Sequence, residues 1–409
     1  MHGPMDGVRV VEVAQFTFVP SSGAVLADWG ADVIKIEHAE TGDAQRGLVR
    51  IMGLDAATPG VNFFPIMEGP NRGKRSLGLT LGSPDATEIL HELVRRADVF
   101  VTNFLPSARR KAGIDVDQIR AVNPDVIYVR GTGFGNKGPE RDAGGYDATG
   151  FWARGGSADL LTAPESEQYV NMPTGAYGDN IGGMTIAGGI AAALFKRERT
   201  GESSIVDVSL LSVGAWATQY SSNVAMILGG PAPRLAPSST GPRNPITGTY
   251  RTKDGRWVTL NMLQPGKYWA EFCRVVERPD LAEDPRFLDG NLLLQNGQEA
   301  AAIVAEILAS KTQAEWLPIF TAMDGQWSPV QNTWELSQDA SLRANGLVAQ
   351  VTDVDGKPRE LILSPVLFDE SPPQIDRAPA FAEHTDEILG ELGISQERLL
   401  ELKLAGIVT

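Results

Sequence analysis

Runs of β-branched and other apolar residues recur along the first half of the chain, with little alternation between apolar and polar positions. This pattern is typical of strands that are buried on both faces of a parallel sheet. The predicted strands are VRVVEVA (8–14), ADVIKIE (31–37), SLGLTL (76–81), ADVFVTNF (97–104), DVIYVRGTGFG (125–135) and IVDVSLL (205–211). Helix-forming segments separate the earlier runs, so the order strand, helix, strand predicts parallel crossovers and an α/β fold of Rossmann type.

Polar and glycine-rich segments follow these strands. A doubly wound sheet binds its ligand beyond the carboxyl ends of its strands. We therefore expect one crevice, bordered by QFTFVP (15–20), EHAETGD (37–43), TNFLPSARRK (102–111) and GTGFGNKGP (131–139). The last segment has neither the G-x-x-x-x-G-K-[ST] pattern nor a G-x-G-x-x-G that leads into a helix, which disfavours those kinds of nucleotide binding.

The pattern changes after residue 229. The segment 229–245, GGPAPRLAPSSTGPRNP, is rich in Gly, Pro and Ser and predicts a mobile loop at a domain boundary. The segment 247–262, TGTYRTKDGRWVTLNM, predicts a hairpin with its turn at Lys253-Asp254-Gly255. Together with two helical stretches, this hairpin predicts a smaller α+β domain over about 225–330. Short strands and a charged helix are expected in the final part of the chain.

Composition narrows the class of protein. The chain has 409 residues, 42% of them hydrophobic, so it can bury sizeable cores, and its net charge of -15 disfavours nucleic acid as a partner. The single cysteine, Cys273, and four scattered histidines argue against a disulfide and a metal site. The sequence contains no signal pattern at its start and no apolar run long enough to cross a bilayer, which predicts a cytoplasmic protein.

Asp179 stands among glycines in GAYGDNIGGM, where a small-residue helix is expected from about Asn180 to Arg199. Most aspartates at such a position are N-caps, which accept hydrogen bonds from the first free amides of the helix. The alternative is a carboxylate nucleophile that the helix N-terminus orients, with nearby amides stabilising an oxyanion when it attacks an acyl group. The residues around Asp179 leave both interpretations open.

Two basic segments fall near the predicted ligand edge, NRGKRS (71–76) and SARRKAG (107–113). A single Lys or Arg is usually a solvated surface charge, but two such groups at one crevice favour a small anionic ligand even on an acidic protein. Tyr146, in GGYDATG, is interpreted as a lining residue rather than an acid, because the unperturbed pKa of tyrosine is about 10.

Longer motifs occur in a fixed order along nearly the whole chain. They are MDGVRVVEVAQF, LADWGADVIKIEHAETGD, NRGKRSLGLTL, ADVFVTNFLPSARRKAGI, NPDVIYVRGTGFGNKGPERDAGGYD, GDNIGGM with RERTGESSIVDVSLL, YRTKDGRWVTLN and AEHTDEILGELGI. With these motifs the chain resembles the class III CoA-transferases, or CaiB/BaiF family, which include formyl-CoA transferase, carnitine-CoA transferases and alpha-methylacyl-CoA racemases.

The resemblance implies an interlocked, ring-like homodimer. Each chain is expected to build a Rossmann-like large domain from both its ends and a small domain from its middle. On this basis the large, CoA-binding domain comprises 1–210 and 335–409, the small α+β domain comprises 225–330, and the linkers are 211–224 and 331–334. The C-terminal segment thereby gains a place in the large domain.

The resemblance also implies a role for Asp179, which stands where the family's acyl-accepting aspartate lies, at the same distance before the RERTG turn. Its carboxylate is expected to attack the donor thioester and form a mixed anhydride, which the released CoA thiolate converts into an aspartyl thioester. The acceptor carboxylate then forms a second anhydride, from which CoA takes the new acyl group. Because an anhydride is at least as activated as a thioester, no metal, redox group or other tightly bound cofactor is required.

Two residue differences separate transfer from racemisation. The racemases of the family pair a histidine with the aspartate and support it with a glutamate, and these positions correspond to Tyr146 and Gln264 here. The loss of two acid–base groups disfavours proton transfer at carbon. We therefore expect transfer of CoA from an acyl-CoA to a carboxylic acid, in a substrate pocket lined by Thr17, Tyr146 and Gln264. An acyl-CoA racemase or isomerase, and a non-catalytic CoA-binding homologue, are the alternatives.

The CoA site that the resemblance implies departs from formyl-CoA transferase. Basic positions that hold the CoA phosphates in that enzyme appear as His38, Gly82 and Gly144, while Lys111 is kept. Its run of glycines over the aspartate is replaced by SSTGPRN (238–244), which argues against formate or oxalate as substrates. The expected CoA-binding residues are Phe16, Phe18, His38, Arg46, Arg72, Arg75, Leu79, Asn103, Phe104, Arg110, Lys111 and Leu210.

Overall fold

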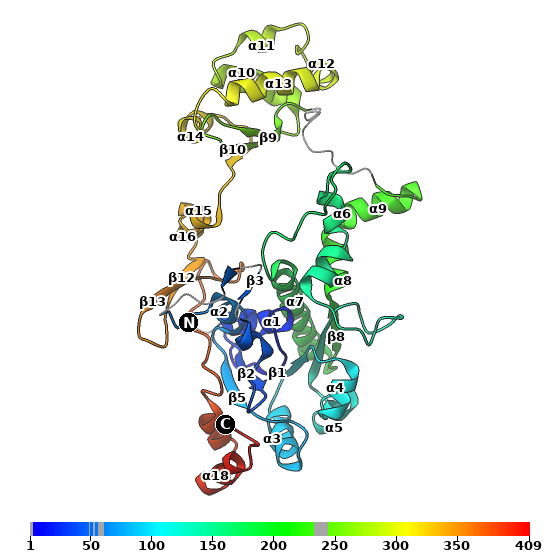
Figure 1. The fold of residues 1–409 in the computed structure, drawn as a ribbon, viewed down its shortest axis with the longest axis vertical. Helices are drawn as coiled ribbons and strands as arrows, with labels where there is room; N and C mark the ends of the chain where they lie inside the picture. The colour runs from blue at the N-terminus through cyan, green and yellow to red at the C-terminus, as the bar shows by residue number, and fades with distance from the viewer. Residues whose placement is uncertain (1–2, 49, 52–53, 56–60, 233–243) are drawn as a thin grey trace. The chain divides into compact units, whose positions relative to one another are not determined.

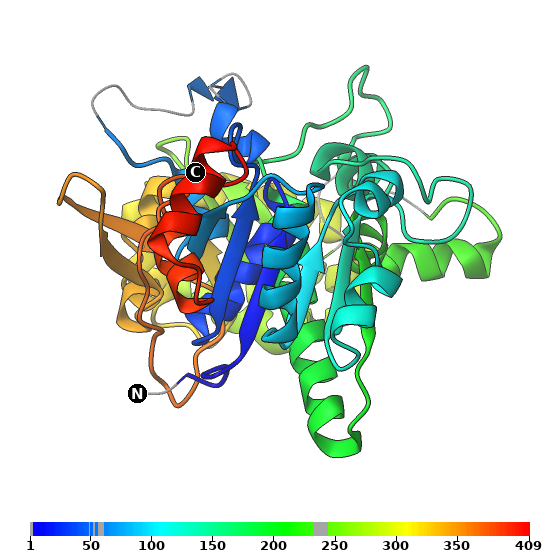
Figure 2. The same ribbon diagram turned by 90° about the horizontal axis from the view of Figure 1, so that it is seen from below.

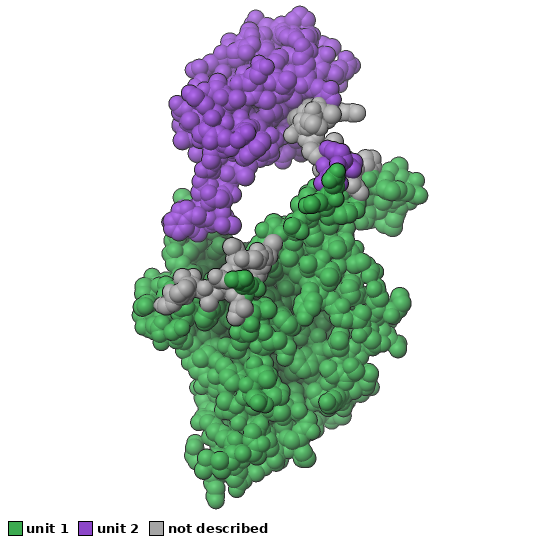
Figure 3. Space-filling view, in the orientation of Figure 1, with its two compact units in different colours: residues 1–162, 167–233, 340–409 green, residues 163–166, 234–339 purple. Residues whose placement is uncertain are grey.

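The computed structural model describes residues 3–48, 50–51, 54–55, 61–232 and 244–409. Two compact units make up the chain (Figure 3). Unit 1 combines residues 1–162, 167–233 and 340–409, and unit 2 combines residues 163–166 and 234–339. The first and the last part of the chain therefore belong to the same unit.

Unit 1 is built on a six-stranded parallel sheet (Figure 1, Figure 2). Its strands are β1 (Arg9–Val13), β2 (Asp32–Glu37), β5 (Arg75–Gly78), β6 (Val99–Thr102), β7 (Ile127–Thr132) and β8 (Ile205–Ser209). The order across the sheet is β5-β2-β1-β6-β7-β8, so the chain winds outward from β1 in one direction and then continues from β6 in the other. The predicted parallel α/β sheet is confirmed, and the reversal beside β1 marks where such sheets bind ligands.

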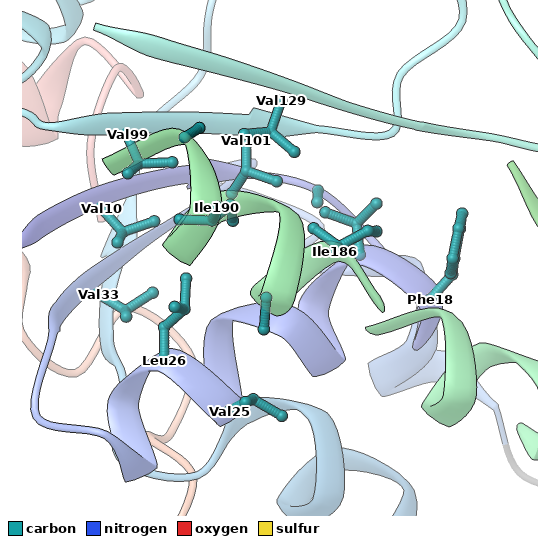
Figure 4. Packing of buried hydrophobic residues seen from close by; sticks show 14 of the residues in the cluster. Val10, Phe18, Val25, Leu26, Val33, Val99, Val101, Val129, Ile186 and Ile190 are labelled. Atoms are coloured by element: carbon teal, nitrogen blue, oxygen red, sulfur yellow. The ribbon is translucent and has the colours of Figure 1, made fainter. Parts of the chain in front are cut away.

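Helices cover both faces of this sheet. On one face, α1 (Phe18–Asp28) and α7 (Tyr177–Thr200) share a core with the strand residues Val10, Val33, Val99, Val101 and Val129 (Figure 4). A second core, on the other face, takes in α3 (Pro84–Arg95), α5 (Val116–Val122), α17 (Thr385–Glu391) and α18 (Gln396–Leu404). Neighbouring strand residues enter opposite cores, which explains why the strand sequences have no polar face.

α7 approaches α1 closely because it presents glycines to it. A Cβ atom on Gly182 would lie 2.3 Å from the ring of Phe18, and one on Gly183 would lie 2.4 Å from Cβ of Ser21. Gly188, on the same helix, faces open space. The packing of the two helices therefore requires glycine at the first two positions and not at the third.

The C-terminal segment covers the β5 edge of the sheet. The N–H of Thr80 donates to the carbonyl of Ile407 at 2.9 Å, and Leu79 pairs with Val408 in an antiparallel bridge.

The other elements of unit 1 are η1 (Ala44–Gly47), β3 (Arg50–Ile51), β4 (Leu54–Asp55), α2 (Pro65–Asn71), α4 (Pro106–Lys111), η2 (Asp147–Ala153), α6 (Ser157–Leu161), α8 (Leu210–Ala217), α9 (Gln219–Leu228), α16 (Ala340–Ala344), β12 (Val348–Thr352) and β13 (Pro358–Ile362).

Unit 2 has a hydrophobic core of its own, around Trp269, Phe272, Trp316 and Phe320. Its sheet is the predicted hairpin of β9 (Thr247–Arg251) and β10 (Trp257–Asn261), joined on the β10 side by β11 (Trp327–Pro329). Its helices are α10 (Pro265–Val275), α11 (Asp280–Glu283), α12 (Gly290–Gln295), α13 (Gly297–Leu308), α14 (Gln313–Phe320) and α15 (Thr333–Ser337).

The two units differ in extent from the predicted domains. Residues 211–224, predicted as a linker, form α8 and part of α9 in unit 1, because Ser209 caps α8 and Leu210 and Val213 are buried. Residues 331–334 belong to unit 2, where Asn332 caps α15. Of the predicted loop at 229–245, residues 233–243 lie outside the described residues.

Candidate active site

A cleft of about 490 Å³ opens at the carboxyl ends of β1, β6 and β7. Its walls come from three of the segments predicted to border a crevice, from residues 141 and 143–146, and from the first turn of α7 and the start of α8. The cleft brings together seven of the predicted site residues, namely Phe16, Phe18, Asn103, Phe104, Tyr146, Asp179 and Leu210.

A smaller cleft of about 220 Å³ adjoins the first, because Gln15 and Phe104 line both. It contains His38 and Leu79, two further predicted CoA-binding residues, and it is bordered by the segment EHAETGD. The four segments predicted to surround one crevice thus surround two adjoining clefts at the same edge of the sheet.

Asp179 is the third residue of α7 and does not cap the helix. The N-cap position belongs to Ala176, whose φ of 62° lies in the left-handed region. The N-cap interpretation of Asp179, and the predicted helix start near Asn180, are therefore wrong. A non-glycine residue in this conformation is uncommon and has no sequence signal, so the early start of α7 could not be predicted.

Asp147 serves as the acceptor at the start of α7 instead. The N–H of Gly178 donates to both carboxylate oxygens of Asp147 at 3.1 Å, and Asp147 is only 6% exposed. A Cβ atom on Gly178 would lie 2.2 Å from the ring of Phe151 and 2.5 Å from Oδ1 of Asp147, so glycine is required here. The helix N-terminus therefore binds Asp147, which leaves the carboxylate of Asp179 to the cleft.

Asp179 is difficult to ionise in this position. Burial, and then the negative charge of Asp147, raise the pKa of Asp179 to about 7. Burial also raises the pKa of Asp147. Hydrogen bonds from the N–H groups of Gly178, Asp179 and Tyr177 lower this pKa but do not cancel the effect of burial. A carboxylate with a pKa near neutrality in a cleft is typical of a catalytic group.

The wall of the cleft beside Asp179 is aromatic. Phe16 has a φ of 63°, in the left-handed region, and its ring meets that of Tyr146 edge to face with centroids 5.4 Å apart. Tyr146 is 63% exposed, so its ring is accessible to a ligand. Thr17, a predicted pocket residue, precedes α1 and donates from Oγ1 to Oε1 of Gln45 at 2.9 Å.

The predicted phosphate-binding residues fall into two groups. Arg110 and Lys111 are exposed at the end of α4, whose first turn lines the cleft, and Arg110 has only a long ion pair of 4.0 Å with Asp115, so both charges can reach an anionic ligand. The others already form ion pairs of 2.6 to 2.7 Å, Arg46 with Glu37, Arg72 with Asp28 and Arg75 with Asp32. A phosphate contact by any of these three arginines would have to compete with its carboxylate partner.

Gln264 lies in unit 2, where it is exposed and immediately precedes α10. Its place in the substrate pocket stays a prediction. The same holds for closure of the site by the segment 229–245.

Sequence reasoning missed a set of buried charged residues beneath the clefts. Glu12, Lys35 and Asp43 are at most 1% exposed, and Nζ of Lys35 lies 2.8 Å from Asp43 and 3.2 Å from Glu12. The available signal was the presence of single charges inside the β-branched runs VVEV and VIKIE, because a buried strand carries a charge only when it has a partner. Asp147 was missed as well, although it follows the predicted pocket residue Tyr146.

Comparison with known proteins identifies the family. Residues 5–385 match the model of CoA-transferase family III. The chain belongs to CoA-transferase family III. This finding confirms the family that the sequence motifs resemble and makes CoA transfer the general reaction class of the chain.

Similar proteins cover this family III chain almost completely. It is 33% identical over 413 residues to an (R)-2-hydroxy-4-methylpentanoate CoA-transferase from Clostridioides difficile, with 99% of both chains covered. It is 32% identical to a cinnamoyl-CoA:phenyllactate CoA-transferase from Clostridium sporogenes, covering 97% of this chain and 95% of that protein. The crystal structure of a CAIB/BAIF family protein from Brucella suis gives a TM-score of 0.79 at 26% identity, covering 96% and 100% of the two chains.

Acyl-CoA and carboxylate substrates fit this family, so CoA enters as a substrate. Over residues 3–48, 50–51, 54–55, 61–232 and 244–409, no three or more His, Cys, Asp or Glu side chains are grouped so that they could hold a metal ion. Within the same residues, no helix combines the length and the hydrophobicity needed to cross a bilayer.

Proposed function

We propose that this family III chain moves CoA from an acyl-CoA thioester to a carboxylic acid, with Asp179 as the nucleophile. The observation that carries the proposal is the placement of Asp179, a carboxylate at the wall of the cleft whose burial raises its pKa to about 7. A carboxylate of higher pKa is a stronger nucleophile than an ordinary one and still ionises near neutral pH.

In the first half of the proposed reaction, an oxygen of Asp179 attacks the thioester carbonyl, and the C–S bond breaks to give an acyl-aspartyl anhydride and CoA thiolate. The thiolate then attacks the aspartyl carbonyl, which forms an aspartyl-CoA thioester and releases the donor acid as a carboxylate. In the second half, the acceptor carboxylate attacks this thioester, which gives a new anhydride and CoA thiolate. Attack of the thiolate on the acceptor carbonyl forms the new acyl-CoA and restores Asp179. No proton is consumed.

The surroundings of Asp179 support these steps. Asp147 accepts the N–H of Gly178, so the carboxylate of Asp179 is not held by the helix N-terminus and can form a covalent bond. We place the adenosine part of CoA at the smaller cleft, against His38, Leu79 and Phe104. Arg110 and Lys111 are the exposed cations for its phosphates.

The aromatic wall of the main cleft indicates which carboxylic acids fit the site as substrates. Phe16, Phe104 and Tyr146 line the main cleft, and contacts with such rings favour acyl groups with apolar side chains over formate or oxalate. The names of the two relatives above specify 2-hydroxy acids with a branched or an aromatic side chain. We therefore propose apolar 2-hydroxy acids as the first acceptors to examine.

A homodimer is part of the proposal. Every residue of α9 is at least partly exposed. Four of its large apolar side chains are each more than half exposed, namely Tyr220, Met226, Ile227 and Leu228. Four large apolar side chains exposed on one helix are costly to leave in water, so a second copy of the chain is the proposed partner.

The test is to trap the covalent intermediates. Incubation with an acyl-CoA and hydroxylamine should give a hydroxamate at Asp179, located by mass spectrometry, and labelled CoA should exchange into a panel of acids. Asp179→Ala should lose both signals while its circular dichroism is unchanged. Exchange of the α-proton in heavy water without CoA exchange would indicate a racemase instead, and CoA binding without either reaction would indicate a non-catalytic binder.

A further inference from the structure

The turn between β1 and α1, residues 14–17, places Phe16 in the cleft beside Tyr146 and Asp179. Its φ of 63° is unfavourable for a bulky side chain and persists only when surrounding contacts impose it. The groups that impose this conformation are therefore part of what shapes the proposed site.

The side chain of Asp43 holds Phe16 directly. Oδ1 of Asp43 accepts the N–H of Phe16 at 3.0 Å and the N–H of Gln45 at 2.9 Å. Gln45 in turn accepts the hydroxyl of Thr17 at 2.9 Å. One carboxylate thus fixes the backbone of Phe16 and, through Gln45, the side chain of the next residue.

Asp43 is itself fixed by buried charges. Its Oδ2 lies 2.8 Å from Nζ of Lys35, which also binds the carbonyl of Ala14 at 2.9 Å and Glu12 at 3.2 Å. Glu12 is shared with Lys74, whose Nζ lies 2.7 Å from it and 2.8 Å from the carbonyl of Pro20. The network links β1 to the carbonyl of Ala14 at the start of the turn and to the carbonyl of Pro20 in the first turn of α1. A buried ion-pair network of this kind permits little rearrangement.

We propose that Asp43 is a positioning residue for the transfer reaction: through its bond to the Phe16 N–H it keeps the Phe16 ring against Tyr146 at the wall of the cleft that contains Asp179. Asp43 does not touch the reacting atoms. This inference rests on the proposed function, because the positioned wall matters only if the chemistry occurs at Asp179.

The experiment compares Asp43→Ala and Asp43→Asn with a matched control, Asp353→Ala. Asp353 is also buried in unit 1, accepts the N–H groups of Asp355 and Lys357 and pairs with Arg359 at 2.8 Å, but it lines neither cleft. Hydrogen exchange is followed on the peptide that covers residues 14–18, and kcat and KM are measured for CoA exchange between an acyl-CoA and an acid.

Asp43→Ala should lose exchange protection at residues 14–18, with kcat lowered by about tenfold or more, because misplaced groups beside a reacting centre slow the reaction. Asp43 also lines the smaller cleft, where we place adenosine, so kcat and the exchange protection are the deciding readouts and the KM for acyl-CoA is not. Asp43→Asn should recover part of kcat and of the protection, because its amide oxygen can still accept from Phe16. Asp353→Ala should leave kcat and residues 14–18 unchanged.

Three results would overturn the proposal. They are a kcat near the wild-type value despite lost protection at 14–18, retained protection in Asp43→Ala, and an equal fall in kcat in Asp353→Ala. If Asp43→Ala does not fold, Asp43→Asn decides by the same readouts. Absence of CoA exchange in the wild-type protein would refute the proposed function instead, and the exchange protection of residues 14–18 would still report whether Asp43 holds the turn.

Discussion

At the scale of single residues, two neighbouring carboxylates have different environments and different tasks. Asp147 accepts the N–H of Gly178 at the start of α7, while Asp179, the residue after Gly178, faces the cleft. Burial raises the pKa of Asp147, although hydrogen bonds from amides oppose this rise, whereas for Asp179 burial and the charge of Asp147 raise the pKa to about 7. Separation of two carboxylates into a structural and a reactive one is a common way to assign roles in an active site.

The pKa of Asp179 predicts the pH dependence of the reaction. The nucleophile must be ionised, so kcat/KM should rise by about tenfold per pH unit below pH 7 and level off above it. In Asp147→Asn the amide oxygen can still accept from Gly178 but the charge is gone, so the inflection should move to lower pH. Burial, the larger cause, should keep it above the value of an ordinary aspartate. A profile that is flat between pH 5 and 8 in the wild-type protein would contradict this assignment.

The same raised pKa predicts that Asp179 destabilises the folded chain. A carboxyl whose pKa rises on folding is neutral at low pH, and its cost grows as pH rises from the unfolded pKa to the folded value near 7. Asp179→Asn should therefore be more stable than the wild type above pH 7, by about 2 to 4 kcal/mol after allowance for partial exposure, and about equal at pH 4. Thermal unfolding at both pH values measures this, and a gain that is independent of pH would count against an ionic cause.

The sequence predicted which strand-end residues share a cleft better than it predicted their backbone conformations. Asp179, Phe16 and Tyr146 do line one cleft, because strand ends in a parallel sheet meet at one edge. The left-handed conformations of Phe16 and Ala176, and with them the role of Asp147 as acceptor, were not predictable, since they depend on tertiary contacts and not on local propensity.

At the scale of elements, the packing of α7 on α1 decides where Asp179 lies. The contact is close because Gly182 and Gly183 bring the backbone of α7 to Phe18 and Ser21. Phe18 also lines the cleft, so the same contact joins the packing of the helices to the proposed site.

Alanine substitutions at two glycines of α7 should distinguish the effect of helix packing on stability from the effect of helix propensity. Gly183→Ala should lower stability by about 1 to 3 kcal/mol, because its Cβ would meet Ser21, where the backbone must move. Gly188→Ala, on the same helix but facing open space, should raise stability by about 0.5 to 1 kcal/mol. Unfolding in urea compares the two, and a similar effect of both substitutions would show that the close approach is unimportant.

The strands were predicted well because buried parallel strands are continuous apolar runs, and β1, β2, β6 and β7 lie within the predicted ranges. The helices α8 and α9 were missed, because residues 211–224 were assigned as a linker from the family resemblance and not from their own pattern, whereas the cap at Ser209 and the burial of Leu210 start a helix. Local signals of this kind are weaker than hydrophobic periodicity.

At the scale of the whole molecule, each of the two units has its own core, and unit 1 exposes an apolar helix, α9. The proposed homodimer predicts that Ile227→Glu, at a position 85% exposed, shifts the sedimentation of the protein toward the monomer. Leu404→Glu, on α18 and 81% exposed, is the matched control and should leave the dimer intact. Equal sedimentation of the wild type and Ile227→Glu, or a wild type that is monomeric at all concentrations, would contradict the use of α9 as an interface.

The closing of the β5 edge by residues 407 and 408 has a consequence for synthesis on the ribosome. Gly78 donates to Thr385, 307 residues later in the chain, and the bridge from Leu79 to Val408 spans still more. Translation at roughly 5 to 20 residues per second leaves that edge uncovered for some tens of seconds. An unpaired edge strand is a template for aggregation, so we expect the nascent first half of unit 1 to be prone to aggregation until its last segment arrives.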